Sequence, residues 1–383
     1  MVKRRRKRSI KRIPRRVGVL VIAVLSVLLA GLLTSAALTM TRGSGRDARA
    51  ADTLRPIASA FPSVLSTGLT TSRPPSPSPS PSPTHPHAVP AYDPSLHNCG
   101  PAPHTCGYPD ATNTGVPTGM SLRSVPGQAS SGPGWSTDGG GNVTVFGNGA
   151  VFAGYSVAGS VNVTGDNAVI KDDAISNFGD DTSGDGINLT GNPSNVTIEH
   201  VDISSPHGTS GDMGVFAGIK DIDGEAMGTK LLDNNIADAS TGVQIYIGLI
   251  EGNYIHDETP ADPSSHLNGT TSNGSTVPLT IEHNTVFNPN SQTDAISLFE
   301  DFGVEANVLI TGNLVAGGGY TIYGGQNAGG PRAYNIRITD NRFSTIYYAQ
   351  SGFFGYIAAF DPTAPGNVWS GNIWDTTGAT ADP

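Results

Sequence analysis

The sequence has 383 residues, including 49 Gly and 28 Pro, and carries a formal net charge of −10 at pH 7. Ten of its 22 Lys and Arg residues lie between positions 3 and 16, so the rest of the chain has 12 basic against 32 acidic residues, a formal charge of −20. A body this acidic repels a phosphate backbone, which excludes nucleic acid as a natural partner.

The N-terminus has the pattern of an export signal. Residues 1–16 form a basic leader, expected in the cytoplasm, and residues 17–38 contain no charge. At about 1.5 Å per residue, a helix of this length spans the roughly 30 Å hydrocarbon core of a membrane. Small-x-small sites at 34–36 and 48–50 suit a cleaved signal peptide, whereas the long apolar span suits a retained transmembrane signal anchor. Both alternatives place the remaining chain outside the cytoplasm.

Residues 39–97 are expected to be a disordered linker rich in Pro and Ser. Ser and Pro alternate up to position 83, and such a tract favours semi-rigid polyproline II instead of a packed core. A single folded domain is expected at 98–383. It opens with Cys99 and Cys106, whose spacing in an exported chain predicts a small disulfide-closed loop that fastens the first coil of the fold.

A short phrase recurs between positions 166 and 374: apolar, any, apolar, any, any, Asn, any, apolar. Clear copies centre on Ile281, Ile310 and Ile338, and the central positions of successive copies lie 19 to 33 residues apart. This period is typical of a stacked repeat. Apolar residues two apart form one face of a strand, and the Asn suits a tight bend because it tolerates the left-handed conformation. Without helix-period segments, the pattern predicts an all-β, right-handed parallel β-helix in which the Asn side chains stack along the axis.

The strands that follow the Asn bends can be aligned by their apolar positions. One outward column then holds amides, a hydroxyl and rings: Asn188, Phe216, Gln244, Asn268, Ser297 and Tyr323. Two residues further along, Tyr246 and Phe299 add two more rings. Amides hydrogen-bond sugar hydroxyls and aromatic faces stack on sugar rings, so a polysaccharide-binding groove is one interpretation. The alternative is that any exposed sheet carries such residues.

One stretch resembles a known family. Residues 106–119 (Cys-Gly-Tyr-Pro-Asp-Ala-Thr-Asn-Thr-Gly-Val-Pro-Thr-Gly) are similar to the opening of exported bacterial right-handed parallel β-helix proteins of the pectate-lyase-like superfold. The resemblance continues to the C-terminus through 253–256 (Asn-Tyr-Ile-His) and 371–374 (Gly-Asn-Ile-Trp). It implies the fold, but most of the family has no assigned activity, so it implies little chemistry.

The resemblance departs from the family at one phrase. Members usually carry His-x-Asp-Gly-Ile-Gln where this chain reads His-Leu-Asn-Gly-Thr-Thr at 266–271. Asn268 therefore replaces the Asp, and any acid–base role of that Asp does not transfer. His266, with Asp262 four residues before it, is a candidate general base. The alternative is a surface His bonded to a loop.

Acidic residues recur near the same strands, notably Asp294, Glu300 and Asp301. Two carboxylates either side of a bond would suit glycoside hydrolysis. Clustered carboxylates could equally hold Ca²⁺ through oxygen ligands, or simply form solvated corner turns. A β-elimination lyase would need a basic residue beside the substrate, and only Lys220 falls near the strip.

Together these features predict a monomeric extracytoplasmic β-helix, membrane-anchored or secreted, whose long face engages a polysaccharide. Because the acidic domain would repel a polyuronate, a neutral or weakly acidic glycan is expected. Two functions stay open. One is a carbohydrate-active enzyme, a hydrolase or a lyase-like protein; the other is a non-catalytic surface module that binds or has a structural role.

Overall fold

The structure is a computed structural model that describes residues 95–176, 184–204, 215–327 and 329–383. The basic leader, the apolar segment 17–38 and most of the expected linker lie outside these residues. Within the described part, no helix is long and apolar enough to cross a membrane.

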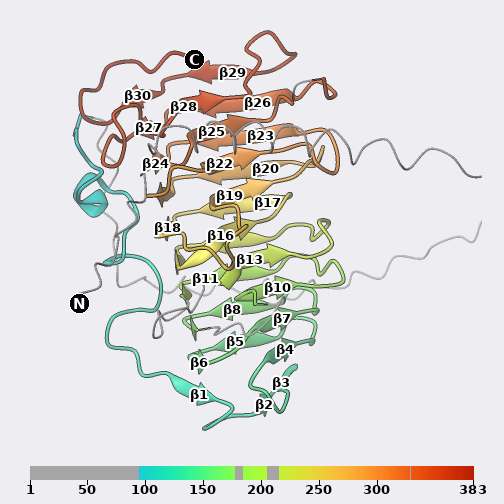
Figure 1. Cartoon of the computed structure of the whole chain (residues 1–383). Coiled ribbons are helices and arrows are strands. Elements are labelled where there is room, and N and C mark those ends of the chain that lie inside the picture. Colours follow the sequence, from blue (N-terminus) through green and yellow to red (C-terminus); the bar gives the residue numbers. More distant parts are fainter. Residues whose placement is uncertain (1–94, 177–183, 205–214, 328) are drawn as a thin grey trace, which may run out of the picture. The chain divides into compact units, whose positions relative to one another are not determined.

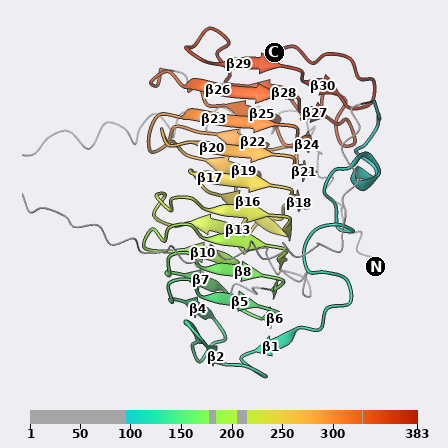
Figure 2. The same ribbon diagram turned by 180° about the vertical axis from the view of Figure 1, so that it is seen from behind.

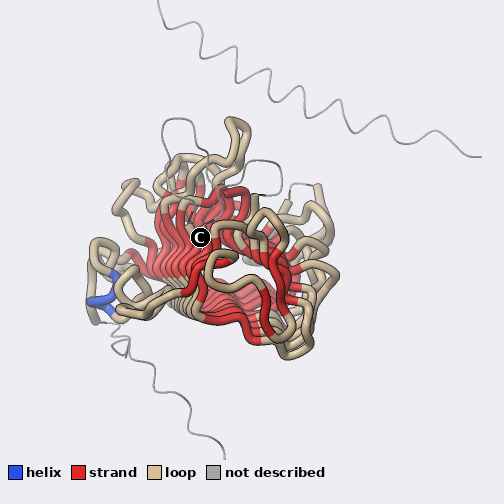
Figure 3. The backbone as a smooth tube through the Cα atoms, turned by 90° about the horizontal axis from the view of Figure 1, so that it is seen from below, coloured by secondary structure: helices blue, strands red, loops and turns tan. Residues whose placement is uncertain are grey.

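The described residues wind into a parallel β-helix, as the repeat predicts (Figure 1). Each coil contributes one strand to each of three sheets, which are named A, B and C and defined by their strands below. Along the chain, a coil passes through sheet C, then sheet A, then sheet B. Strands of successive coils superpose when the axis is viewed end-on (Figure 3). The helical element of the described part is one 3-10 turn, η1 (Pro103–Cys106), which lies outside the coils.

The three sheets contain ten, eleven and nine strands. Sheet A comprises β1 (Arg123–Val125), β6 (Tyr155–Val157), β9 (Ala174–Ile175), β12 (Asp202–Ile203), β15 (Asn235–Ala237), β18 (Tyr254–His256), β21 (Thr285–Asn288), β24 (Leu314–Gly317), β27 (Arg342–Phe343) and β30 (Ile373–Trp374). Sheet B comprises β2 (Ser131–Gly132), β3 (Trp135–Thr137), β4 (Val143–Val145), β7 (Val161–Val163), β10 (Ile187–Leu189), β13 (Val215–Asp221), β16 (Ala239–Gln244), β19 (Asn268–Ser272), β22 (Asp294–Leu298), β25 (Tyr320–Gly324) and β28 (Gly355–Ala358). Sheet C comprises β5 (Val151–Ala153), β8 (Val169–Lys171), β11 (Thr197–Glu199), β14 (Lys230–Leu232), β17 (Gly248–Glu251), β20 (Leu279–Glu282), β23 (Ala306–Thr311), β26 (Tyr334–Thr339) and β29 (Val368–Ser370).

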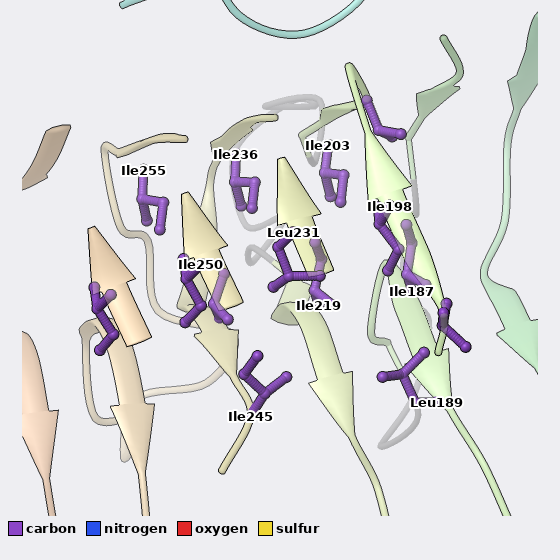
Figure 4. Packing of buried hydrophobic residues seen from close by; sticks show 14 of the residues in the cluster. Ile187, Leu189, Ile198, Ile203, Ile219, Leu231, Ile236, Ile245, Ile250 and Ile255 are labelled. Atoms are coloured by element: carbon purple, nitrogen blue, oxygen red, sulfur yellow. The ribbon is translucent and has the colours of Figure 1, made fainter. Parts of the chain in front are cut away.

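The core consists of vertical columns of branched aliphatic side chains. Ile281, Ile310 and Ile338 are register partners in sheet C and are almost fully buried, which confirms the predicted column. Sheet A supplies a second column through Ile203, Ile236 and Ile255, and sheet B a third (Figure 4). Each coil therefore packs on its neighbours through like residues, as stacked repeats do.

A continuous ladder of Asn side chains lies at the corner between sheets C and A. Its rungs are Asn234, Asn253, Asn284, Asn313, Asn341 and Asn372, each buried and joined to the next by an Nδ2–Oδ1 hydrogen bond of 2.8–3.0 Å. The Oδ1 of Asn284 also accepts the backbone N–H of Asn253 at 2.9 Å. The Asn253 amide donates in turn to the carbonyl of Leu231 in the coil before. The ladder thus supplies hydrogen-bond partners to the backbone N–H and C=O groups that are not paired within a sheet at this bend.

The left-handed residue of this corner is not the Asn, contrary to the prediction. The positive φ belongs to the residue before it, with +52° at Asp233, +53° at His283 and +58° at Asp340. The same position is Gly in three other coils: Gly252, Gly312 and Gly371. Because the preceding residue makes the turn, the Asn is free to point inward and join the ladder.

The ladder is interrupted near its N-terminal end. Val201 stands where an Asn would be, and Asp173 takes the same place one coil earlier. Asp173 is fully buried, and its Oδ1 accepts the backbone N–H of Tyr155 at 2.7 Å. Burial raises the pKa of this carboxyl to about 8, although the Tyr155 hydrogen bond opposes the shift. A protonated Asp173 is the closest mimic of an Asn at this position.

Both ends of the stack are closed by side chains. At the N-terminal end, β2, β3 and β4 are antiparallel, and the buried ring of Trp135 contacts Phe152 and Tyr155 at 5.0 Å between centroids. At the C-terminal end the last residues fold back, and the Trp369 indole donates to the carbonyl of Ala381. Such caps shield the apolar faces that the first and last coils would otherwise expose.

A strap formed by residues 95–122 runs along the outer face of sheet A, against the direction of coil growth (Figures 1 and 2). It begins at the last coil, where Asn98 donates to the Asp375 carbonyl at 2.8 Å. It ends at the first coils, where Arg123 donates to Gly154 at 3.0 Å. Midway, Tyr108 stacks on His283 with ring centroids 5.5 Å apart. One segment therefore touches coils from one end of the stack to the other.

The Cys99–Cys106 disulfide belongs to this strap. Its cysteines pack with Tyr108 against Leu314 and Ala316 on the outside of sheet A. The disulfide therefore fastens the strap to the C-terminal coils, which corrects the expectation that it ties down the first coil. The prediction failed because both cysteines lie in a strap outside the coils, which contacts the last coils before the chain enters the first one.

Replacing Ile310 by Ala is expected to lower the free energy of unfolding by about 2–5 kcal/mol, because the substitution leaves a cavity in a filled column. Denaturant unfolding of the isolated domain followed by circular dichroism measures the change. Val151→Ala, at an exposed position of the same sheet, serves as the control. An equal loss in both variants would contradict the stacked-column account.

Replacing Asp173 by Asn is expected to stabilise the domain as pH rises. The folded pKa of Asp173 lies above its ordinary value, so its contribution is complete below about pH 3.8 and is lost as pH rises through about 8. At pH 9 the variant should be more stable than the parent by about 1 kcal/mol or more, and the advantage should shrink toward pH 5. Thermal unfolding at several pH values tests this. Asp340→Asn, at an exposed carboxyl that directly precedes the ladder residue Asn341, is the control, and a benefit independent of pH would refute the explanation.

Candidate functional site

The outer face of sheet B carries two adjoining hollows. One, of about 390 Å³, lies over β16, β19, β22 and β25; the other, of about 290 Å³, lies over β13, β16 and the loop before β19. Thr241, Gln244 and His266 line both. Because they share a wall, we treat the two as one feature, the sheet B groove, with a first and a second hollow.

A single column of side chains runs along this sheet in strict register. In chain order it is Asn188, Lys220, Gln244, Thr271, Ser297 and Tyr323. Four of the six residues aligned from the sequence share this column. The other two, Phe216 and Asn268, lie elsewhere, because β13 and β19 are each placed differently from the sequence alignment.

In β13 the core position is Ile219, four residues beyond the one expected. Ile219 pairs with Ile187 and Val243, which places Lys220 in the column, while Phe216 lines the second hollow. Gly218 explains the register: a Cβ there would lie 2.6 Å from the carbonyl oxygen of Gly242. Only a glycine allows the two strands to approach this closely at the bend.

In β19 the core position is Thr270, three residues beyond the one expected. Thr270 pairs with Val243 and is 1 % exposed, so Thr271 takes the column position. Leu267, which the alignment placed in the core column, is buried at the preceding corner instead. Asn268 pairs with Thr241, donating to its hydroxyl at 3.2 Å, and lines the first hollow. The register of β19 could not be predicted from the spacing of apolar residues, because polar residues occupy its buried positions.

Three rings border the groove. Phe299 and Tyr323 both line the first hollow, with centroids 5.4 Å apart. Tyr246 stands beside it, and its hydroxyl accepts hydrogen bonds from Gln244 at 3.0 Å and from Asn273 at 3.5 Å. The amide of Gln244 is thereby oriented. These contacts hold rings and amides in one fixed arrangement.

Two side chains that line the first hollow each carry a buried oxygen that lacks a protein partner. The Oδ1 of Asn268 and the Oγ1 of Thr271 have no hydrogen-bond partner among the described residues, although the two side chains are only 7 % and 6 % exposed. A buried polar atom left unpaired costs about 1–3 kcal/mol.

Two buried carboxyls lie at this part of the sheet. Asp294 pairs with Asn268 in register and is fully buried, and burial raises its pKa well above the ordinary value against the opposing effect of Ser297. Burial also raises the pKa of Glu258 well above its usual range, with further contributions from Asp257 and Asp294. Burial, followed by the charge of Asp294, raises the pKa of Tyr323. The interior edge of the groove therefore favours neutral, protonated carboxyls.

The second hollow is more polar. Lys220 lines it, and its charge partly opposes the burial that raises the pKa of Asp185. Asp262 and His266 line the same hollow, but no hydrogen bond joins them in the described structure. Asp262 instead accepts from the Ser264 hydroxyl and backbone, and the Ser264 hydroxyl contributes most to lowering its pKa. His266 and Asp262, the suggested base and carboxylate, therefore line the same hollow but are not hydrogen-bonded to each other.

The acids considered for Ca²⁺ are distributed differently. Asp301 lines the first hollow and Asp294 is buried, while Glu300 lies beyond the end of β22. Nowhere in the described ranges do three or more His, Cys, Asp or Glu side chains come together in a way that could hold a metal ion.

Sequence reasoning noted Lys220 near the strip but did not place it or Thr271 in the column, and it did not single out Glu258. Lys220 and Thr271 occupy column positions, and Glu258 is the second buried acid. A signal for the first two was present: Gly186, Gly218, Gly242 and Gly269 each precede the central core residue of their strand. Aligning those glycines gives the observed register. No comparable pattern marks Glu258.

No protein-family model matches this sequence, and the comparison with curated proteins also gave no match. Among solved structures, the chain is similar to the Dettilon tailspike protein, with 18 % sequence identity and a TM-score of 0.40. The matched region covers 62 % of this chain and 60 % of that protein, so the chain spans about three fifths of the tailspike's length.

Proposed function

We propose that the sheet B groove binds a neutral or weakly acidic polysaccharide. The observation that carries this proposal is the composition of the first hollow. It places the amide side chains of Gln244, Asn268 and Asn273 in one lining with the rings of Phe299 and Tyr323. Hydrogen-bonding groups next to aromatic faces complement sugars, which present hydroxyl edges and apolar ring faces.

The charge of the domain favours a neutral ligand. Among the described residues that line the groove, Lys220 is the basic one, and it lies close enough to Asp185 to affect its titration. A polyuronate carries a charge on every sugar and would meet an acidic body with little to neutralise it. A neutral chain meets no such repulsion.

The geometry of the sheet favours a chain over a single sugar. Parallel strands lie about 4.8 Å apart, so equivalent side chains of successive coils recur at that spacing along the groove. Gln244 and Thr271 are consecutive in the column and both line the first hollow, whereas the next residue, Ser297, is fully buried. A linear polymer of repeating units can address several of these positions at once.

Glycoside hydrolysis is a second candidate, favoured by the two types of carboxyl at the first hollow. Burial raises the pKa of Asp294, the direction that a general acid requires, while Asp301 lines the hollow itself. Asp294 does not line the hollow, however, so we place binding without turnover first. His266 is the candidate base in this alternative.

The location we propose is extracytoplasmic. The Cys99–Cys106 disulfide suits an oxidising compartment, and the basic leader with its apolar segment would direct the chain there. Whether that segment also anchors the protein is a separate question that N-terminal sequencing of the mature protein answers.

Substituting Gln244 or Tyr323 by Ala is expected to weaken glycan binding by roughly three- to tenfold each, the range for one hydrogen bond or one stacked ring. Isothermal titration of the purified domain against a panel of neutral polysaccharides measures the effect. Tyr334→Ala removes an exposed ring from sheet C and should leave affinity unchanged. Binding should also survive excess chelator. Tight binding of pectate or alginate in chelator would overturn the charge argument.

The wild-type domain is expected to release no more reducing ends or unsaturated products from a bound glycan than an Asp294→Asn variant does. This follows because Asp294 is buried away from the hollow and Asp262 is not bonded to His266. Product assays over hours at pH 5 to 8 provide the measurement. Turnover that falls sharply in Asp294→Asn or His266→Ala, with affinity retained, would establish the hydrolase alternative instead.

A further inference from the structure

A line of ring contacts leads out of the sheet B groove toward the C-terminal end. Tyr323 in the first hollow contacts Tyr320 at 5.6 Å between centroids, and Tyr320 contacts Phe354 at 5.8 Å. Phe354 contacts Phe353 at 4.8 Å, and Phe353 contacts Tyr348 at 5.6 Å. The loop between β27 and β28 supplies the last three rings. We call these five residues the aromatic track.

The outer rings of the track are exposed yet held in place. Phe353 and Phe354 are 49 % and 60 % exposed. Their backbone N–H groups donate to Gly318 and Gly319 at 2.8 and 2.7 Å, and the Tyr348 hydroxyl donates to Pro289 at 2.9 Å. A loop pinned to the preceding coil presents these rings without a further ordering cost. Adjacent exposed apolar rings on a soluble domain are typical of an interaction site.

The middle of the track borders a third hollow of about 450 Å³. Tyr320 and Phe354 line it together with Gln350, Tyr356 and Trp374. The contact between Tyr320 and Tyr323 links this hollow to the first one. Its Tyr356, Ile357 and Trp374 side chains also pack against the hydrophobic core near the C-terminal end of the stack. Its lining repeats the combination found in the first hollow, rings beside an amide.

We propose that the aromatic track is a second glycan-stacking subsite, which a polysaccharide chain reaches by continuing out of the first hollow. This inference rests on the proposed function and extends it. The N-terminal part of the groove would then contribute mainly hydrogen bonds, and the C-terminal part mainly stacking. A long chain gains from both parts, whereas a disaccharide gains from one.

Continuity with the groove favours a glycan as the occupant. Tyr320 and Gln350 add a hydroxyl and an amide to the lining beside the ring of Phe354, which gives the surface the mixed character that sugar rings require. None of the residues lining the third hollow is basic, so nothing there would attract an anionic lipid surface. A second copy of the chain is the occupant that the experiment must distinguish.

The test compares a Phe353→Ala, Phe354→Ala double variant with wild type by isothermal titration. The probes are cellohexaose, mannohexaose and xylohexaose, each with its disaccharide. The double variant should bind a hexasaccharide roughly tenfold more weakly, since two stacked rings are lost, and should bind the disaccharide unchanged. Gln244→Ala should weaken both. Phe146→Ala, an equally exposed ring at the opposite end of the stack, is the matched control.

The outcomes separate the two proposals. Unchanged hexasaccharide affinity in the double variant, with a loss in Gln244→Ala, overturns the aromatic track and leaves the groove intact. Failure of wild type to bind any of the probes overturns both. Sedimentation velocity covers the remaining occupant: a wild-type dimer that the double variant converts to monomer would make the track a self-association surface and overturn the inference.

Discussion

The register of the coils between Asn234 and Asn372 depends on the hydrogen bonds of the Asn ladder. Each rung donates to the next coil's Oδ1, and each Oδ1 accepts both a side-chain and a backbone N–H, as Asn253 and Asn284 show. A shift of one coil by a single residue would break several buried hydrogen bonds at once, and each buried polar group left unpaired costs about 1–3 kcal/mol. Apolar columns alone are more permissive, since Ile and Leu pack in many arrangements. The polar corner therefore sets the register, and the aliphatic columns supply most of the stabilisation.

A fixed register at one corner has consequences on the far side of each coil. Sheet B lies after the variable bends, and its strands range from the two residues of β2 to the seven of β13. Still, Lys220, Gln244 and Thr271 fall in one column. The loops absorb differences in length, while the ladder keeps successive coils from rotating. The regular column of side chains in the sheet B groove therefore depends on the Asn ladder, which lies at the corner between sheets C and A.

The parts of this fold that are local in sequence could be predicted, and the parts that depend on long-range contacts could not. The ladder and the Ile281–Ile310–Ile338 column follow from short, repeated spacing. In sheet B the apolar rule failed, because Thr270 occupies a core position and a glycine column carries the register signal instead. The strap could not be predicted for another reason. Asn98 donates a hydrogen bond to Asp375, and no sequence pattern near either residue indicates that the two are in contact. Buried acids such as Glu258 likewise look no different from surface ones in a sequence.

The strap also indicates which face of the solenoid is available for binding. Sheet A is covered on the outside by residues 95–122, where Cys106, Tyr108 and Phe287 form a second apolar cluster (Figure 2). Sheet C displays charged side chains to solvent, for example the Lys171–Glu199 pair at 3.9 Å, and such pairs contribute little energy and need no partner. Sheet B is the face that combines rings, amides and unpaired buried polar atoms with adjoining hollows. The strap covers sheet A and charged side chains occupy the outer face of sheet C, so sheet B is the face best suited to an uncharged polymer. For that reason we place the proposed glycan site in the sheet B groove.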